Sequence, residues 1–375
     1  MKIAYIAPFR DGTGYSQSAI DHILALDAAG VTVAPRAVKM TPTNGEVPNR
    51  IKELEDNDLN NVDVVIQHNL PSEFVYKGGV QNVGIFAYET NGFPNCLWKD
   101  HLELMDKIVV SCSYQKAAVS RTGGENLSRK THVLLHPVDI SKYDQDYDTM
   151  YFDIPDNYVK FYTIAEFGRR KNLVALITAY YSAFSSFDNV LLIVKTHMPN
   201  RDGEEAAKVI SELCLQLKKD LSRFSDPEYY PKIALMTDYM PNKHINSIHA
   251  TGDVFVTASH GEAICLPFVD ALGFGKPAIA PYYSAFTDYF IDKDLLVDST
   301  ESVVFGVPNA PKGIYTADER WGNVSLKHLI EVMRYAYDNI GQLNTDELRK
   351  ARKNAVYNLS YEKVGQSLKD ILDAK

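Results

Sequence analysis

The stretch DVFVTASHGEAICLPFVDALGFGKPAIAP, residues 253–281, decides the fold that we expect for this chain. An apolar run at 254–257 leads through a polar loop into a helical pattern at 267–274. Gly275 and the proline two residues later end that helix, and a second apolar run covers 278–280. This order predicts a strand, a loop, a helix and a second strand that lies parallel to the first in a buried sheet.

Two acidic residues of this unit are candidates for ligand binding. Glu262 lies in the loop and Asp270 in the predicted helix. A loop that leaves the carboxyl end of a parallel strand is where α/β proteins hold ligands, and the start of the next helix offers N–H groups to an anion. One acid at the mouth of the loop and one in the helix therefore suit a ligand that carries several hydroxyl groups and phosphate.

The string SHGEAICLPFVDALGFGKPAIA in this unit resembles the donor-binding signature of the family 4 glycosyltransferases. That family has the GT-B fold, an α/β architecture of two Rossmann-like parallel-sheet domains that face each other across a cleft. Its members bind a nucleotide sugar with a Glu, a glycine-rich turn that ends in Leu-Pro, and a second acid. The residues that match are Glu262, Leu266, Pro267, Ala271, Gly275, Lys276 and Pro277.

The resemblance implies that the nucleotide sugar contacts the loop between the two acids, as well as Glu262 and Asp270. These loop residues are Ala263, Ile264, Cys265 and Leu266. Ala263 and Cys265 stand where the family usually has glycine, which lets a sugar approach the backbone closely, so the shape of the sugar pocket differs here. Asp270 stands where the family usually has Glu, which keeps the charge but shortens the reach by one methylene.

Composition sets the outer bounds on structure and on partners. The chain has 375 residues, of which 45% are hydrophobic, and this is enough for two domains with a core each. A net charge of −9 argues against nucleic acid or an anionic membrane as the main partner. Four cysteines at no recognisable spacing indicate reduced thiols in a cytoplasmic protein. Residues 1–8 are too short for a signal peptide, and no apolar stretch reaches the ~20 residues of a membrane span.

The predicted elements divide the chain into two domains and a final helix. We expect a Rossmann-like acceptor domain at 1–145 and a Rossmann-like donor-binding domain at 158–358, because strands and helices alternate in both. An Asp- and Tyr-rich linker joins them at 142–158. The resemblance to GT-B enzymes implies that the helix in 359–375 packs back on the N-terminal domain.

The loop FRDGTGYSQSA, between the first strand at 3–7 and the helix at 16–29, contains Gly12 and Gly14. It is a weak dinucleotide fingerprint, because the third glycine is missing and no acid follows the second strand at the expected place. In family 4 enzymes the corresponding loop faces donor and acceptor, which makes Gly14 a candidate contact. A tight turn without a functional role is the alternative.

Two residues of the N-terminal half follow predicted strands directly. The strand 62–67 leads to His68, and the strand 83–88 leads to Glu89 in YETNGFPNCLW. Side chains at the carboxyl ends of parallel strands are well placed for a site. A buried ring bonded to backbone is the alternative for His68. The string around Glu89 resembles an ET-x-x-x-P-x-x-W run of family 4, which implies an acceptor-side or sugar-contacting role for this acid.

Basic residues begin the helix after the strand 161–165, in EFGRRKNLVALITAYYSAF. Positive charge opposes the helix dipole there unless an anion binds, and a solvated helix end is the alternative. The family holds the donor diphosphate with an Arg and a Lys at this place, and Lys171 matches the Lys. Either Arg169 or Arg170 supplies the second charge, or the site has one cation fewer, because Glu166 stands where many members have the first Arg.

A further candidate region follows the strand 233–236, in TDYMPNKHINSIHA. In the family this strand end frames the nucleobase through backbone groups, so Tyr239 and Met240 are candidates for that contact. The resemblance also implies a co-substrate, a UDP- or GDP-sugar, and no tightly bound cofactor.

The implied reaction is a hexosyl or pentosyl transfer with retention of anomeric configuration. The bond from the anomeric carbon to the diphosphate breaks, and the leaving group gathers negative charge. Lys171 with Arg170 or Arg169 can hold that charge without a metal. Three Asp-x-Asp strings lie in polar stretches and end no convincing strand, so we expect no metal site. Because no carboxylate nucleophile stands out, same-face attack assisted by the leaving phosphate is favoured over a two-step route.

Two other functions stay open at the level of sequence. One is a sugar-nucleotide 2-epimerase of the same fold. The other is a non-catalytic nucleotide-sugar-binding subunit, for which the departures at Glu166, Ala263 and Cys265 would account. The acceptor is also open between a glycan, a lipid-linked sugar, a protein and modified nucleic acid, and the sequence does not fix the oligomeric state.

Overall fold

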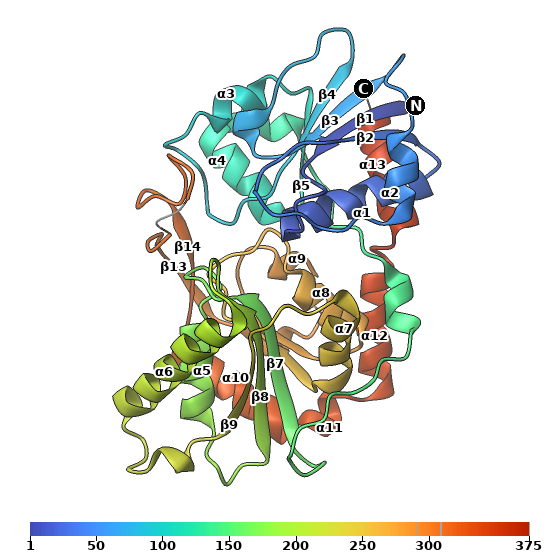
Figure 1. The fold of residues 1–375 in the computed structure, drawn as a ribbon. Coiled ribbons are helices and arrows are strands. Elements are labelled where there is room, and N and C mark those ends of the chain that lie inside the picture. Colours follow the sequence, from blue (N-terminus) through green and yellow to red (C-terminus); the bar gives the residue numbers. More distant parts are fainter. Residues whose placement is uncertain (290, 308–309, 375) are drawn as a thin grey trace. The chain divides into compact units, whose positions relative to one another are not determined.

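The computed structural model describes residues 1–289, 291–307 and 310–374 (Figure 1). The chain folds into two compact units, each of which is assembled from separate stretches of sequence. Unit 1 comprises Met1–Lys142, Val303–Trp321 and Val356–Lys375, and unit 2 comprises Tyr143–Ser302 and Gly322–Ala355. Each unit contains a six-stranded parallel sheet with helices packed around it, which confirms the predicted GT-B class of α/β fold.

The sheet of unit 1 is built from the apolar runs of the N-terminal half. Its strands are β1 (Lys2–Ala7), β2 (Thr32–Ala37), β3 (Val64–His68), β4 (Gln81–Ile85), β5 (Lys107–Val110) and β6 (Thr131–Val133). They are parallel and lie in the order β2-β1-β3-β4-β5-β6. The strand order changes direction between β1 and β3, and such a switch point is where open α/β sheets bind ligands.

The last helix of the chain packs on the first helix, within unit 1. The helices here are α1 (Gly14–Ala28), α2 (Asn49–Glu55), α3 (Trp98–Glu103), α4 (Ser113–Lys130) and α13 (Tyr361–Asp373), with short 3₁₀ turns at Pro71–Glu73 and Ile140–Asp144. A Cβ at Gly365 would collide with the carbonyl oxygen of Ala25, so glycine permits the close approach of α13 to α1. Lys107 donates to the last carbonyl groups of α13, which fixes the end of that helix.

Unit 2 repeats the architecture with the strand order β12-β11-β10-β7-β8-β9. Its strands are β7 (Val159–Glu166), β8 (Val190–His197), β9 (Lys232–Met236), β10 (Val254–Val256), β11 (Ala278–Pro281) and β12 (Leu296–Val297). Here the order changes direction between β7 and β10, which are paired in parallel. The unit that we expected at 253–281 therefore supplies two neighbouring strands at the centre of this sheet.

Helices and an apolar core complete unit 2. The helices are α5 (Leu173–Ala183), α6 (Gly203–Leu221), α7 (Asn242–Thr251), α8 (Leu266–Gly273), α9 (Phe286–Tyr289), α10 (Leu326–Asp338), α11 (Ile340–Leu343) and α12 (Asp346–Tyr357), with 3₁₀ turns at Pro227–Tyr229 and Lys293–Leu295. Side chains of β7, β8, β10, α5 and α10 form one buried cluster. Within the described part of the chain, no helix combines the length and the apolar character that a bilayer crossing requires.

One segment of unit 1 lies between the two stretches of unit 2 in the sequence. Strands β13 (Ser299–Val303) and β14 (Arg320–Val324) pair with each other, and the chain between them belongs to unit 1. Ile314 joins the buried cluster that contains Tyr88 and Trp98. Glu319 is fully buried and accepts hydrogen bonds from the hydroxyl groups of Tyr88 and Thr90.

One local prediction is wrong. The strand predicted at 83–88 ends at Ile85, because Phe86 and Tyr88 leave the sheet and pack with Trp98, so Glu89 lies in a loop and not at a strand end. Helix α2, for which no prediction was made, buries Ile51 and Leu54 on an otherwise polar helix.

Candidate functional site

The candidate site lies at the carboxyl edge of the unit 2 sheet, at its switch point. The loop after β7 carries Arg169, Arg170 and Lys171, and the loop after β10 carries Glu262. Because β7 and β10 are parallel neighbours, both loops leave the same edge of the sheet. Fold topology therefore brings together residues that are separated by about ninety positions in the sequence.

Glu262 is held between two cations. Its side chain is 2% exposed, and Lys171 Nζ donates to its Oε1 at 2.6 Å. Arg170 Nη1 donates to Oε2 at 2.8 Å and to the carbonyl oxygen of Gly261 at 2.9 Å. Arg169 and Arg170 were both candidates for the second cation. Of the two, Arg170 contacts Glu262, whereas Arg169 is exposed and lies near His260.

The charge of Glu262 depends on these partners. Burial alone would raise the pKa of its carboxyl group, but the positive charges of Arg170 and Lys171 outweigh burial and hold the pKa below its ordinary value. The carboxylate is therefore ionised near neutral pH. The side chains of Arg170, Lys171 and Glu262 together carry one net positive charge at this edge of the sheet.

Hydrogen bonds between the two loops fix the cations in place. Asn172 precedes α5 in a left-handed conformation, with φ of 52°, and its Nδ2 donates to the carbonyl oxygen of Ala258 at 3.2 Å. The backbone N–H of His260 donates to the carbonyl oxygen of Arg170 at 2.8 Å. Burial and the nearby Arg169 lower the pKa of His260 despite a bond from its ring to the Gly322 carbonyl, so this imidazole is neutral.

Ser284 is a site residue that sequence reasoning missed. It is 2% exposed, and its Oγ accepts a hydrogen bond from the backbone N–H of Glu262 at 3.0 Å. The N–H of Ala285 donates to the Glu262 carbonyl oxygen at 3.1 Å. Ser284 follows β11, the next parallel strand at this edge, and that position was the signal that could have identified it.

The other candidate residues of the loop after β10 lie at the start of α8. Ala263 and Cys265 are buried, whereas Ile264 and Leu266 are half-buried. Burial raises the pKa of the Cys265 thiol to about 12, so this cysteine is neutral. The second acid, Asp270, is partly exposed on α8, and Tyr143 Oη donates to its Oδ1 at 2.7 Å.

The loop after β9 presents the two candidates for the nucleobase contact. Tyr239 is 91% exposed, and Met240 is half-buried. Lys195 at the end of β8 is buried, and its Nζ donates to the carbonyl oxygen of Asp238 at 2.9 Å. Sequence reasoning missed Lys195, which fixes the base of this loop from the neighbouring strand.

His68 and Glu89 of unit 1 occupy different environments. The His68 ring is 2% exposed, and its Nδ1 lies 2.9 Å from the hydroxyl oxygen of Tyr5. Burial and the neighbouring His22 hold its pKa well below the usual range, so the ring is neutral. This is a buried histidine, as the alternative expected, although its partner is a tyrosine and not the backbone. Glu89 is partly exposed and accepts a hydrogen bond from Tyr315.

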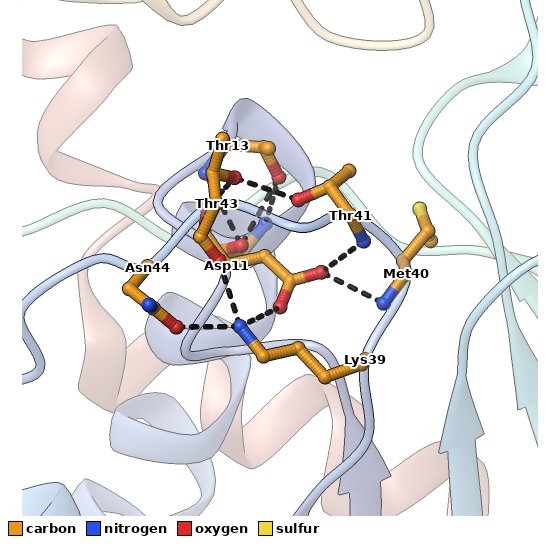
Figure 2. A network of polar contacts seen from close by, with 8 residues as sticks. Asp11, Thr13, Lys39, Met40, Thr41, Thr43 and Asn44 are labelled. Atoms are coloured by element: carbon orange, nitrogen blue, oxygen red, sulfur yellow. Dashed lines mark hydrogen bonds and ion pairs between the residues drawn. The ribbon is translucent and has the colours of Figure 1, made fainter.

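The first loop of unit 1 is ordered by a buried aspartate (Figure 2). The Oδ2 atom of Asp11 accepts from the backbone N–H groups of Met40 and Thr41 at 2.8 and 2.7 Å, and Lys39 Nζ lies 3.4 Å from Oδ1. Those N–H groups outweigh the effect of burial and lower the pKa of Asp11. Gly14 itself begins α1 in an open environment, so packing does not require a glycine there.

No group of three or more His, Cys, Asp and Glu side chains in the described ranges could hold a metal ion. One Asp of the three Asp-x-Asp strings, Asp292, instead forms a two-pronged ion pair with the buried Arg352. At the carboxyl edge of unit 2, the charged groups that contact one another in the candidate site are those of Arg170, Lys171 and Glu262.

Two consecutive parallel six-stranded α/β sheets, with the last helix returned to the first unit, define a glycosyltransferase fold of the GT-B class. Solved structures of this class resemble the chain over almost their whole length. The sucrose-phosphate synthase from Thermosynechococcus elongatus is 14% identical, with 99% of this chain and 98% of that chain covered and a TM-score of 0.66. A glycosyltransferase from Rickettsia africae ESF-5 is 15% identical, with coverage of 100% and 99% and a TM-score of 0.63.

HepE from Anabaena, solved in complex with UDP and glucose, is 13% identical, with coverage of 99% of both chains and a TM-score of 0.62. The TM-scores show a common fold, and at identities this low the likeness extends to the fold alone. No protein-family model and no curated protein sequence matches the chain.

Proposed function

We propose that this protein is a retaining glycosyltransferase of the family 4 type, which moves a hexose or pentose from a UDP- or GDP-sugar to an acceptor hydroxyl group without a metal. The observation that carries the proposal is the cluster of Arg170, Lys171 and Glu262 at the switch point of unit 2. The HepE structure that shares the fold contains UDP and glucose, which supports a nucleotide-sugar donor.

The two cations neutralise the leaving diphosphate in this proposal. Charge accumulates on the diphosphate as its bond to the anomeric carbon breaks, so donors fixed in advance stabilise the transition state more than the ground state. Glu262 fixes both cations from one side, and the carbonyl oxygen of Gly261 also accepts from Arg170. Removal of one such preorganised donor costs roughly 3 to 4 kcal/mol in comparable oxyanion sites.

Glu262 has a second part in the proposal. A carboxylate accepts about four hydrogen bonds, and Arg170 and Lys171 occupy part of that capacity. The remainder suits the hydroxyl groups of the transferred sugar. Because the side chain is buried and ionised, those bonds are charge-assisted and fix the orientation of the sugar over the cations.

The rest of the donor follows from the neighbouring elements. Asp270 accepts hydrogen bonds from the ribose diol, as acids do in other nucleotide sites. The loop residues Ala263, Ile264, Cys265 and Leu266 line the path between sugar and ribose. Tyr239 and Met240 flank the nucleobase, and the 91% exposed Tyr239 ring is available for stacking.

Unit 1 holds the acceptor in this proposal. Glu89, which Tyr315 orients, is the residue that contacts an acceptor or the transferred sugar. The loop that Asp11 orders, with Gly14, lies at the carboxyl edge of the same sheet. The buried His68 does not contact the acceptor itself in this proposal, and it supports the site by packing against the ring of Tyr15. We place the reaction in the cytoplasm on the basis of cysteine usage.

A thermal-shift screen across UDP-, GDP- and ADP-sugars tests the donor assignment. A ligand at a hundred times its dissociation constant adds about 2.7 kcal/mol of stability, so a true donor raises the melting temperature clearly. The donor found in this way is then incubated with candidate acceptors, and the products are analysed by mass spectrometry and by the NMR coupling of the anomeric proton. The proposal expects a transferred sugar that keeps the anomeric configuration of the donor.

Other outcomes of this experiment assign other functions. An isomerised nucleotide sugar in the absence of acceptor would make the protein a 2-epimerase. Binding without transfer or hydrolysis under any condition would make it a nucleotide-sugar-binding subunit. Absence of a thermal shift with every nucleotide sugar would overturn the proposal as a whole.

A further inference from the structure

A tyrosine at the boundary between the units contacts the second acid of the donor site. Tyr143 is the first residue of unit 2 and directly follows the last residue of the first stretch of unit 1. Its side chain is 4% exposed, and its Oη donates to Asp270 Oδ1 at 2.7 Å. This contact joins residues that are 127 positions apart and could not be read from the sequence.

The Tyr143 ring packs against the C-terminal end of α8. A Cβ at Gly273 would overlap the ring, so a glycine one turn after Asp270 is needed to admit it. Phe274 packs edge-to-face against the same ring with centroids 5.4 Å apart, and Phe274 is stacked in turn on His249. The phenol is therefore held by packing, and its hydroxyl group has a fixed place from which to donate.

We infer that Tyr143 is a positioning residue, which holds one oxygen of Asp270 and so fixes the orientation in which the carboxylate meets the ribose of a nucleoside diphosphate. The inference rests on the proposed function, in which Asp270 binds the ribose diol. The Asp270 carboxylate can rotate about its Cβ–Cγ bond, and a hydrogen bond from a fixed donor selects the orientation in which both hydroxyl groups of the ribose can be met. A donor whose own position is fixed by packing supplies that preorganisation.

The experiment compares two tyrosines of the same segment. Tyr143→Phe removes the hydroxyl group and keeps the ring. Tyr147→Phe is the matched control, because Tyr147 packs on Phe274 with centroids 5.7 Å apart, and its hydroxyl group accepts from Asn246 and donates to Gln145. Calorimetry measures the affinity of wild type and both variants for UDP, GDP and ADP. It then measures the affinity for the 2′,3′-dideoxy form of the nucleotide that binds wild type best.

We expect Tyr143→Phe to weaken binding of the ribose nucleotide about fivefold, the size of one net hydrogen bond, and Tyr147→Phe to leave it unchanged. The dideoxy nucleotide should bind wild type and Tyr143→Phe equally, because it lacks the hydroxyl groups that Asp270 would contact. In an Asp270→Asn background the effect of Tyr143→Phe on the ribose nucleotide should shrink, since the two residues act through one contact.

The outcomes separate this inference from the function on which it rests. An unchanged affinity in Tyr143→Phe, or an equal loss for the ribose and dideoxy nucleotides, overturns the inference and leaves the proposed function standing. A wild-type protein that binds none of the three nucleotides overturns the proposed function, and the inference falls with it. Thermal unfolding of both variants shows whether the fold is retained, and the Asp270→Asn comparison gives a second measurement of the same coupling.

Discussion

Replacement of Lys171 by Ala tests the charge arrangement of the site most directly. The change removes the ammonium group 2.6 Å from Glu262 Oε1 and leaves Arg170 on the other carboxylate oxygen. The cluster then falls from one net positive charge to neutrality. A leaving diphosphate would meet one cation that Glu262 already balances, so its developing charge would be poorly compensated.

The magnitude follows from the proposed role of Lys171 in the transition state. Loss of one preorganised donor in an oxyanion site lowers kcat about 10²–10³-fold, and we expect a loss in this range. The effect on the fold should be far smaller, because the Lys171 side chain is 22% exposed and Glu262 keeps Arg170 as a partner. Most of the effect should appear in kcat and little in the donor KM, because the charge develops during bond cleavage.

The assay measures initial rates of nucleoside diphosphate release over a range of donor concentrations. Lys327→Ala is the matched control, because it removes the same charge from the same unit at an 87% exposed position on α10. Lys171→Arg should recover part of the lost activity, since it restores a cation at the same place. A kcat for Lys171→Ala within threefold of wild type, in a protein that is folded and binds donor, would refute the reasoning.

Three further predictions concern stability. Glu319→Ala should lower the melting temperature markedly, because the buried hydroxyl groups of Tyr88 and Thr90 lose the acceptor that they share, and each unsatisfied group costs about 1 to 3 kcal/mol. The control Asp318→Ala changes the exposed neighbouring residue and should have little effect. Gly365→Ala should destabilise the protein, because the new Cβ meets a backbone carbonyl of α1. Gly341→Ala is the control, since its new Cβ meets open space and should leave the stability unchanged. Thermal unfolding of both variants measures the difference. The pKa of Glu262 is lowered in the folded protein, so its ionised form stabilises the fold at pH values above the ordinary glutamate pKa of 4.5. This stabilisation is lost as the pH falls through the lowered pKa, and the loss of stability in acid should therefore be smaller in Glu262→Gln. Identical acid unfolding curves of wild type and Glu262→Gln would contradict this.

The fold class and the loop after β10 could be predicted from the sequence for a physical reason. Buried parallel strands read as short apolar runs, and the run at 254–257 with the helix after it marked the centre of the unit 2 sheet. Glu262 and Lys171 were each predicted in a segment that follows an apolar strand, and the resemblance to family 4 singled them out. Which arginine joins them could not be predicted, because Arg169 and Arg170 differ only in the direction that the loop gives their side chains.

Contacts between distant segments were not accessible in this way. Glu319 meets Thr90 across 229 positions, and Tyr143 meets Asp270 across 127 positions, so no local pattern signals either pair. Ser284 carries only the weak signal of a residue after a short strand. Helix α2 was missed because its seven residues are mostly polar, and two buried apolar side chains are too few to show a helical period.

The division of the chain also has a consequence for anyone who wishes to study one half alone. The polypeptide passes between the units after residues 142, 302, 321 and 355, so neither unit is encoded by one continuous segment of sequence. A protein shortened after residue 302 would leave Tyr88 and Thr90 without Glu319, and α1 without α13. Likewise, a single protease cut in any one of these passages would leave three covalent links and would not release either half.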